Sequence, residues 1–413
     1  MESPAGRASA LYLCYFGLRE PLVQTQVLPY LRELSAGDVD VSLLTFEPEL
    51  GRWTREEIAA ESSRLAAQGI RWRRLAYHKR PTLPATAFDI LAGAWTAARI
   101  ARREGVQVLH ARAHVPMAMA MLARAFARCR TVFDVRGLLA DEYADAGVWR
   151  VGSLPFRAVK WLERAGLRRA DGVVVLTRRM REWLAGEGLA DACKVEVIPC
   201  CVDFSRYGGD AGAERQGRFE VVYAGSVSGL YLLEEMARFF LAVRAREPGA
   251  FFRVLTASPA EPAAARLRAV GLSDEDFAVG AARADEVPSV LRRARLGVSF
   301  RKPTFSQIAA SPTKVPEYLA AGLPVVSNAG IGDTDELLER ERVGVLVRDF
   351  GAEALDRAAG AALALAAEPG AAERCAAAAR EHFDLATVGG PRYRKLYRRL
   401  GGAAAAPAES RIL

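Results

Sequence analysis

The chain has 413 residues, with 51% hydrophobic and 26% charged side chains and a formal net charge of +8. This composition excludes a disordered chain, and the length predicts two large domains. No stretch approaches about 18 uninterrupted apolar residues, so we expect no transmembrane helix. The apolar run at residues 11–15 is too short for a signal peptide, and we expect a cytoplasmic protein.

The positive charge lies mostly in the first half of the sequence. Up to residue 205 there are 29 Lys and Arg against 23 Asp and Glu, a net charge of +6, and the remainder has 28 against 26, or +2. This balance suits an anionic membrane surface, a pyrophosphate-bearing acceptor or nucleic acid. We expect no nucleic-acid partner, because no recognised binding module for it is present. The densest basic cluster, residues 71–80, also contains Trp72 and Tyr77. It predicts an interfacial membrane anchor, and the alternative is a solvated loop with one buried Trp.

The first half alternates between strands and helices. Short apolar strands are expected at residues 11–15, 41–46, 106–110, 131–134 and 172–176, with helical runs between them. Alternation of this kind predicts a parallel, doubly wound sheet.

The same pattern restarts after a polar, glycine-bearing joint near residues 205–216. Strands are expected at 219–223, 252–256, 296–300 and 324–327. We therefore expect an α/β protein with two Rossmann-like, doubly wound domains facing a cleft. The predicted boundaries are 1–205 for the first domain, 206–390 for the second, and 391–413 for a basic, aromatic helix with a frayed tail.

Polar residues in the first half follow two of the predicted strands. His110 and Arg112 lie at the end of one strand, and Asp134 and Arg136 lie at the end of the next. The carboxyl ends of parallel strands form the clefts of open α/β folds, so these four residues are candidate catalytic groups. Two alternatives stay open: Asp134 and Arg136 could brace a loop, and His110 could be structural.

The stretch from Ser311 to Asn328, S-P-T-K-V-P-E-Y-L-A-A-G-L-P-V-V-S-N, predicts a helix N-terminus that holds an anion. With Thr313 as N-cap, Pro316 falls at the third helical position, where a backbone N–H has no helical partner. Gly322 would end this helix, and a short apolar strand follows. A loop, a helix N-terminus carrying Lys314 and a strand is the order in which open α/β folds hold phosphates.

Other positions could complete such a phosphate site. Gly225 and Ser226 begin a glycine loop after a strand, where a backbone can approach pyrophosphate closely. That loop has no Arg or Lys, so we expect Arg301 and Lys302, directly after the strand at 296–300, to help neutralise the charge. Glu317 could accept hydrogen bonds from a sugar diol, or could only complement the helix dipole.

The stretch at 311–328 resembles the donor-sugar segment of retaining glycosyltransferases with the GT-B fold, family 4, whose members carry a glutamate before an A-x-G-x-P-V-V run. Residues 17–30, 44–47, 110–112, 134–137 and 197–203 are similar to a bacterial subgroup of these enzymes. The resemblance implies that Glu317 holds the nucleotide ribose and that the final helix crosses back onto the first domain. The expected donor-binding set is then Gly17, Gly225, Ser226, Arg301, Lys302, Ser311, Thr313, Lys314 and Glu317.

The function implied by this resemblance is transfer of a sugar from a nucleotide diphosphate to a glycan or lipid-linked acceptor, with retention, in cell-surface polysaccharide or glycolipid biosynthesis. No cofactor or metal is expected, because the D-T-D sequence formed by Asp333 and Asp335 lies beyond the donor helix. A peripheral location at the inner face of the membrane would suit a lipid-linked acceptor.

The sequence also departs from the family pattern. Ala309 stands where relatives commonly have a second glutamate that contacts the sugar, Asp134 stands near a position where many have a histidine, and Val23 stands where relatives often have glycine. Two alternatives therefore remain: a nucleotide-sugar epimerase of the same fold, and a non-catalytic scaffold that binds sugar nucleotides.

Overall fold

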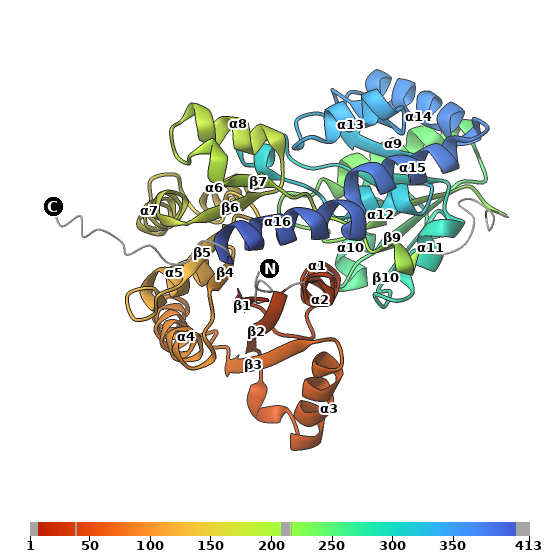
Figure 1. The fold of residues 1–413 in the computed structure, drawn as a ribbon. Helices are drawn as coiled ribbons and strands as arrows, with labels where there is room; N and C mark the ends of the chain where they lie inside the picture. Colours follow the sequence, from red (N-terminus) through yellow and green to blue (C-terminus); the bar gives the residue numbers. More distant parts are fainter. Residues whose placement is uncertain (1–6, 38, 208–214, 216, 402–413) are drawn as a thin grey trace, which may run out of the picture.

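The computed structural model describes residues 7–37, 39–207, 215 and 217–401, and it contains two α/β domains (Figure 1). The first domain has a seven-stranded parallel sheet in the order β3-β2-β1-β4-β5-β6-β7. Its strands are β1 (Ala8–Cys14), β2 (Val39–Glu47), β3 (Ile70–Ala76), β4 (Val108–Arg112), β5 (Arg130–Asp134), β6 (Gly172–Val175) and β7 (Val195–Val197).

Helices cover both faces of this sheet. They are α1 (Pro21–Gln26), α2 (Leu28–Ala36), α3 (Arg55–Ala66), α4 (Thr82–Glu104), α5 (His114–Ala123), α6 (Leu139–Asp145), α7 (Leu154–Arg169) and α8 (Arg178–Gly186). Side chains alternate across a strand. Leu11 and Leu13 of β1 accordingly join one core cluster, with α4, α5 and α7, whereas Tyr12 and Cys14 join the opposite cluster, with α2.

The second domain has a six-stranded parallel sheet in the order β10-β9-β8-β11-β12-β13. Its strands are β8 (Glu220–Ala224), β9 (Phe251–Leu255), β10 (Phe277–Gly280), β11 (Leu296–Ser299), β12 (Val325–Asn328) and β13 (Gly344–Val347). Its helices are α9 (Leu233–Arg246), α10 (Ala260–Val270), α11 (Val287–Arg293), α12 (Lys314–Ala320), α13 (Thr334–Glu341), α14 (Ala352–Ala367) and α15 (Ala371–Phe383). The predicted fold class is confirmed. Most of the predicted joint, residues 208–214 and 216, lies outside the described residues.

The last helix, α16 (Gly390–Gly401), lies against the first domain rather than the second (Figure 1). It follows a π-helical turn at Leu385–Gly389, and it contacts α2, β1 and β4. Tyr393, Leu396, Tyr397 and Leu400 are buried within the core cluster that contains Tyr12. Burial of four large side chains fixes this helix as a part of the first domain.

The domains also touch through the short 3₁₀ helix Phe305–Ala309, which packs on α6 and α8 of the first domain. The hydroxyl of Thr177 donates to the carbonyl of Ile308 at 2.5 Å, and the rings of Trp183 and Phe305 meet edge to face with centroids 5.4 Å apart. Ala309 is fully buried in the first domain's core cluster.

The interfacial anchor at residues 71–80 stays a prediction, but its Trp72 is buried, as in the alternative of one buried Trp. Residues 70–76 form β3, an edge strand. Trp72 is only 5% exposed, and its indole N–H donates to the Thr45 hydroxyl at 2.8 Å. Arg73 forms an ion pair with Glu104 of α4 at 2.9 Å. No helix within the described residues is both long enough and apolar enough to cross a membrane.

Candidate active site

Helix α12 has the predicted boundaries. It begins at Lys314, directly after Thr313, and Pro316 occupies the third helical position. Gly322 follows its end with φ +76°, a left-handed conformation that glycine adopts without strain. The Thr313 side chain, however, forms no capping hydrogen bond. The first turn therefore keeps its backbone N–H groups without a side-chain cap.

Lys314 points from this helix toward the glycine loop after β8. Its side chain is buried, and its Nζ lies 4.0 Å from the ring centroid of Tyr231. A Cβ atom added to Gly225 would lie 3.1 Å from this Nζ, so a residue without a side chain gives Lys314 its room. No carboxylate of the described residues lies within 4.0 Å of the ammonium group. Burial lowers the pKa of Lys314, the Tyr231 hydroxyl opposes this effect, and the Arg301 cation adds to it.

Arg301 also lies against the Tyr231 ring. Its Nη1 donates to the Tyr231 hydroxyl at 2.8 Å, its Nε donates to Gln307 Oε1 at 2.6 Å, and its guanidinium carbon lies 4.6 Å from the ring centroid. Burial alone would raise the pKa of Tyr231, yet Lys314 and Arg301 lower it. We call Lys314, Arg301 and Tyr231 beside Gly225 the cation cluster. Two cations share one aromatic ring and have no carboxylate within ion-pair distance, which is an arrangement suited to an anionic ligand.

Tyr231 was not among the residues predicted from the sequence. It lies two positions after Gly229, where the glycine loop ends, and it forms an isolated antiparallel bridge with Arg301. A tyrosine directly after a glycine loop is a weak signal, because buried tyrosines of this kind are common in cores. Only the fold shows that both cations contact its ring.

Glu317 lies one turn into α12 with a half-buried carboxylate. Within the described residues this carboxylate forms no hydrogen bond and no ion pair. Burial raises the pKa of Glu317 to about 6, although the charges of Arg206 and Lys314 oppose the shift. An acceptor group without a protein partner, one helical turn from Lys314, is free to bind ligand hydroxyl groups.

Other predicted donor-binding residues have protein partners. Ser226 lies in the exposed loop, where its Oγ accepts from the N–H of Ser228 at 3.3 Å. The Ser311 hydroxyl accepts from the N–H of Cys200 at 3.1 Å, and Lys302 Nζ donates to the carbonyl of Asp145 at 3.4 Å. Both of the latter contacts join the two domains.

Gly17 lies in the loop after β1 and is held closely by β2. A Cβ atom there would lie 2.6 Å from Pro48 Cδ and 3.0 Å from Glu47 Oε2, and both Glu47 carboxylate oxygens accept from the Leu18 N–H at 3.0 Å. These contacts account for the glycine by close packing. The roles assigned to Gly17, Ser226, Ser311 and Lys302 stay predictions.

His110 and Asp134, two of the candidate catalytic residues, lie beneath α16 with no exposed surface. His110 Nδ1 is 2.8 Å from the Tyr397 hydroxyl, and its ring stacks on Tyr12 with centroids 4.3 Å apart. Tyr393 donates to Asp134 Oδ2 at 3.2 Å. Burial lowers the pKa of His110, so the imidazole is neutral. These contacts favour the structural alternative for His110, and a catalytic role stays a prediction.

The two arginines complete this buried cluster. Arg112 Nη1 lies 3.7 Å from Asp134 Oδ2 and Arg136 Nη1 lies 3.5 Å from Asp134 Oδ1. Burial alone would raise the pKa of Asp134, but Arg136, His110 and Arg112 hold it well below its usual range. Arg136 also reaches Cys200 Sγ at 3.3 Å, near the connection between the domains. Asp134 therefore pairs with both arginines, which favours the bracing alternative for Asp134 and Arg136, and the catalytic roles of Arg112, Asp134 and Arg136 stay predictions.

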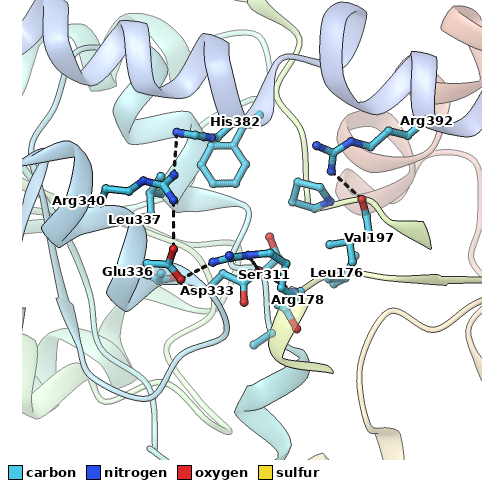
Figure 2. A pocket seen from close by; sticks show the side chains of 15 residues that line it. Leu176, Arg178, Val197, Ser311, Asp333, Glu336, Leu337, Arg340, His382 and Arg392 are labelled. Atoms are coloured by element: carbon cyan, nitrogen blue, oxygen red, sulfur yellow. Dashed lines mark hydrogen bonds and ion pairs between the residues drawn. The ribbon is translucent and has the colours of Figure 1, made fainter. Parts of the chain in front are cut away.

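Figure 2 shows a second region, a cavity of about 300 Å³ at the domain junction. Asp333 accepts there from the backbone N–H groups of Arg178 and Arg179, and Glu336 pairs with the Arg178 guanidinium. Asp335 accepts from the N–H groups of Gly330 and Ile331. The carboxylates of the D-T-D sequence are thus engaged by backbone donors.

Residues 23–206 match the model of a protein family described as Glycosyltransferase Family 4. Residues 23–206, just under half of the chain, are thus similar to this family, and the chain as a whole has the GT-B fold. The match covers strands β2 to β7 and all four residues of the buried cluster named from the sequence. No curated protein matches the chain.

Solved structures share the fold of this chain at low identity. Sucrose-phosphate synthase from Thermosynechococcus elongatus is 18% identical with a TM-score of 0.71, covering 96% of this chain and 100% of that one. HepE from Anabaena, solved with UDP-glucose, is 15% identical with a TM-score of 0.66, covering 94% and 99%. A putative UDP-N-acetylglucosamine 2-epimerase from Listeria monocytogenes is 12% identical with a TM-score of 0.61, covering 98% and 100%. At these identities the likeness shows the GT-B fold alone.

Proposed function

We propose that this glycosyltransferase moves a sugar from a nucleotide diphosphate donor, with retention at the anomeric carbon, onto a lipid-linked or glycan acceptor in cell-surface glycan biosynthesis. The observation that carries the donor assignment is the cation cluster. Lys314 and Arg301 have no carboxylate partner within ion-pair distance, and they lie beside Gly225, where a backbone can approach a diphosphate. Retention rests on the family resemblance.

In the proposed reaction the bond between the sugar and the diphosphate breaks, and negative charge develops on the departing phosphate. Lys314 and Arg301 stabilise that charge from fixed positions in a largely buried site, which is typically the largest catalytic contribution in an enzyme. The Tyr231 hydroxyl, which accepts from Arg301, fixes that guanidinium. Glu317 accepts hydrogen bonds from the ribose diol and so orients the nucleotide.

We further propose that the reaction needs no metal ion, because the two side-chain cations can neutralise a diphosphate. Turnover should persist in EDTA. Complete loss on chelation, restored by Mn²⁺ or Mg²⁺, would contradict this proposal.

The donor experiment is a panel of nucleotide diphosphate sugars, beginning with UDP-glucose because HepE was solved with it. Products are separated in the presence and absence of a membrane-lipid extract. Transfer to an acceptor supports the proposal. Conversion of the nucleotide sugar to an epimer without acceptor would identify the epimerase alternative, and binding without any turnover would identify a scaffold.

For the acceptor side we propose peripheral binding to an anionic membrane through α4. Phe88, Leu91 and Trp95 are 57%, 63% and 63% exposed and are spaced by three and four residues, which places them on one face of the helix. Arg99 and Arg102 continue the same face, and both are exposed. Figure 1 shows α4 on the outer side of the first domain. Apolar and aromatic residues that continue into arginines suit the bilayer interface.

A basic hollow beside this face supports an anionic partner. The hollow measures about 570 Å³ between β3 and α4, and four arginines line it: Arg73, Arg74, Arg99 and Arg103. Glu104 is the one acidic residue among those that line it. Each basic side chain near an anionic bilayer contributes about 1 kcal/mol.

The test uses sedimentation with phosphatidylcholine vesicles and with vesicles that also contain phosphatidylglycerol. The protein should bind only the anionic vesicles, and binding should weaken with salt. The triple variant Phe88→Ser, Leu91→Ser, Trp95→Ser should lose binding, whereas Arg357→Ser on α14 should not. Equal, weak sedimentation with both vesicle types would favour a soluble glycan acceptor.

A further inference from the structure

Glu142 of α6 is a carboxylate of the first domain that lies where the second domain approaches. Its side chain packs over Gly137, where an added Cβ would lie 2.3 Å from Glu142 Oε1. Within the described residues the carboxylate has no hydrogen bond and no ion pair, although it is half-buried. A carboxylate without a protein partner at a domain boundary is available to accept hydrogen bonds from a ligand.

Helix α6 contacts the segment of the second domain that carries Arg301. One turn after Glu142, the carbonyl of Asp145 accepts from Lys302 Nζ at 3.4 Å, and its carboxylate accepts from the Ser306 N–H at 3.4 Å. Arg301 is the strongest opposite charge acting on Glu142, although burial raises the pKa of this carboxyl overall. Glu142 and Arg301 nevertheless form no ion pair, so every carboxylate oxygen of Glu142 is more than 4.0 Å from the guanidinium nitrogens of Arg301. The Glu142 carboxylate is therefore not neutralised by Arg301.

We propose that Glu142 binds a hydroxyl group of the donor sugar from the first-domain side of the cleft. This inference rests on the proposed function, because it needs a sugar attached to the diphosphate held by Lys314 and Arg301. A sugar attached there has on one side the helix that carries Glu317 and on the other side α6.

The proposal also explains the departure at position 309. The family resemblance implies a glutamate there that contacts the sugar, but Ala309 is fully buried in the core cluster of the first domain. A carboxylate at this position would be desolvated among apolar side chains at high cost. Glu142 offers the same chemical group from an adjacent element, because α6 packs directly on the 3₁₀ helix that contains Ala309.

The test separates binding of the sugar from binding of the nucleotide. Calorimetry would measure UDP and UDP-glucose, and also GDP and GDP-mannose, with the wild-type enzyme and with Glu142→Gln. We expect Glu142→Gln to bind the nucleoside diphosphate within twofold of the wild type. For the sugar nucleotide that the wild type turns over, kcat/KM should fall at least tenfold, which corresponds to about 1.4 kcal/mol.

The matched control is Asp141→Asn, which removes the same charge from the neighbouring residue of α6. Asp141 is paired with Lys160 of α7 at 2.8 Å, so this variant should keep wild-type kcat/KM. Unchanged kcat/KM in Glu142→Gln, or equal loss of nucleotide and sugar nucleotide binding, would overturn the assignment of Glu142. A wild-type protein that binds neither nucleotide would instead overturn the proposed function, and with it this inference.

Discussion

Two clusters of ionisable side chains lie near strand ends in this protein, and they differ in what covers them. His110 and Asp134 lie at the ends of β4 and β5, where α16 closes over them and supplies the hydroxyl groups of Tyr393 and Tyr397. Lys314 and Arg301 lie at the corresponding edge of the second sheet, where Tyr231 is shared between two cations.

The difference lies in the balance of charge. In the buried cluster every charge has a partner, since Asp134 faces both Arg112 and Arg136. In the cation cluster the charges have the same sign, and burial lowers the pKa of Lys314 although the Tyr231 hydroxyl and the Glu317 carboxylate oppose this effect. Charged side chains that are paired within the protein contribute to folding. Buried charged side chains without an ion-pair partner mark candidate sites for ligands.

The largest expected effect is on the stability of the buried cluster. Asp134→Asn leaves two buried arginines facing an amide, and removal of one partner from a buried ion pair costs about 3–5 kcal/mol. We expect urea unfolding to show a loss of this size. Tyr393→Phe removes one hydrogen bond from the same carboxylate and should cost about 1 kcal/mol. If Asp134→Asn unfolds like the wild type but loses turnover, the buried cluster is catalytic, and the contrast between a structural cluster and a ligand-binding cluster is wrong.

The opposite pattern is expected for Lys314→Met. This variant removes an unpaired buried charge while keeping the length of the side chain, so the free energy of unfolding should stay the same or rise. Turnover at saturating donor should fall by about 10²–10³-fold, the usual size for one electrostatic stabiliser of a transition state. Lys194→Met, whose Nζ donates to two backbone carbonyls of the first domain, is the matched control. Retained turnover in Lys314→Met would remove this lysine from the diphosphate site.

More of the fold than of the candidate site could be predicted from the sequence. All nine predicted strands correspond to observed strands, because apolar runs bounded by glycine and polar residues are strong local signals. Strands β3, β7, β10 and β13 were missed; in β3 the three arginines obscure the alternation that buries Trp72. The start of helix α12 was predicted correctly, because Pro312 and Pro316 are compatible with few starting positions of a helix.

The partners of the site residues could not be read from the sequence, because they depend on long-range packing. Nothing local indicates that α16 covers His110, or that Arg301 and Lys314 both contact the Tyr231 ring. The exposed face of α4 is visible only after the buried positions of that helix are known, because Phe88, Leu91 and Trp95 have the same spacing as core residues.

A smaller effect is expected for Glu317→Ala, which tests the second domain's site, where charged groups lack a protein partner. A hydrogen bond to a charged group contributes about 1.5–3 kcal/mol, so affinity for the nucleoside diphosphate should fall about 10- to 150-fold. Folding should be unaffected, because the carboxylate has no described partner to lose. Glu353→Gln, at an exposed position in the first turn of α14, is the control. Wild-type affinity in Glu317→Ala would exclude this residue from the nucleotide site.

The smallest expected effect is the pH dependence that Glu317 gives to donor binding. Its pKa is raised to about 6 by burial, so the carboxylate is ionised above pH 6 and becomes protonated as the pH falls below it. Because only the ionised form accepts two hydroxyl donors, affinity for a nucleotide sugar should weaken about tenfold between pH 7.5 and 5. A nucleotide sugar is the proper probe, since its diphosphate diester does not titrate in this range. Stability should change in the opposite direction, because a carboxyl whose folded-state pKa is raised destabilises the fold as the pH rises through 6. Glu317→Gln should flatten both profiles relative to the wild type. Superimposable profiles for the two proteins would show that Glu317 does not titrate in contact with the donor.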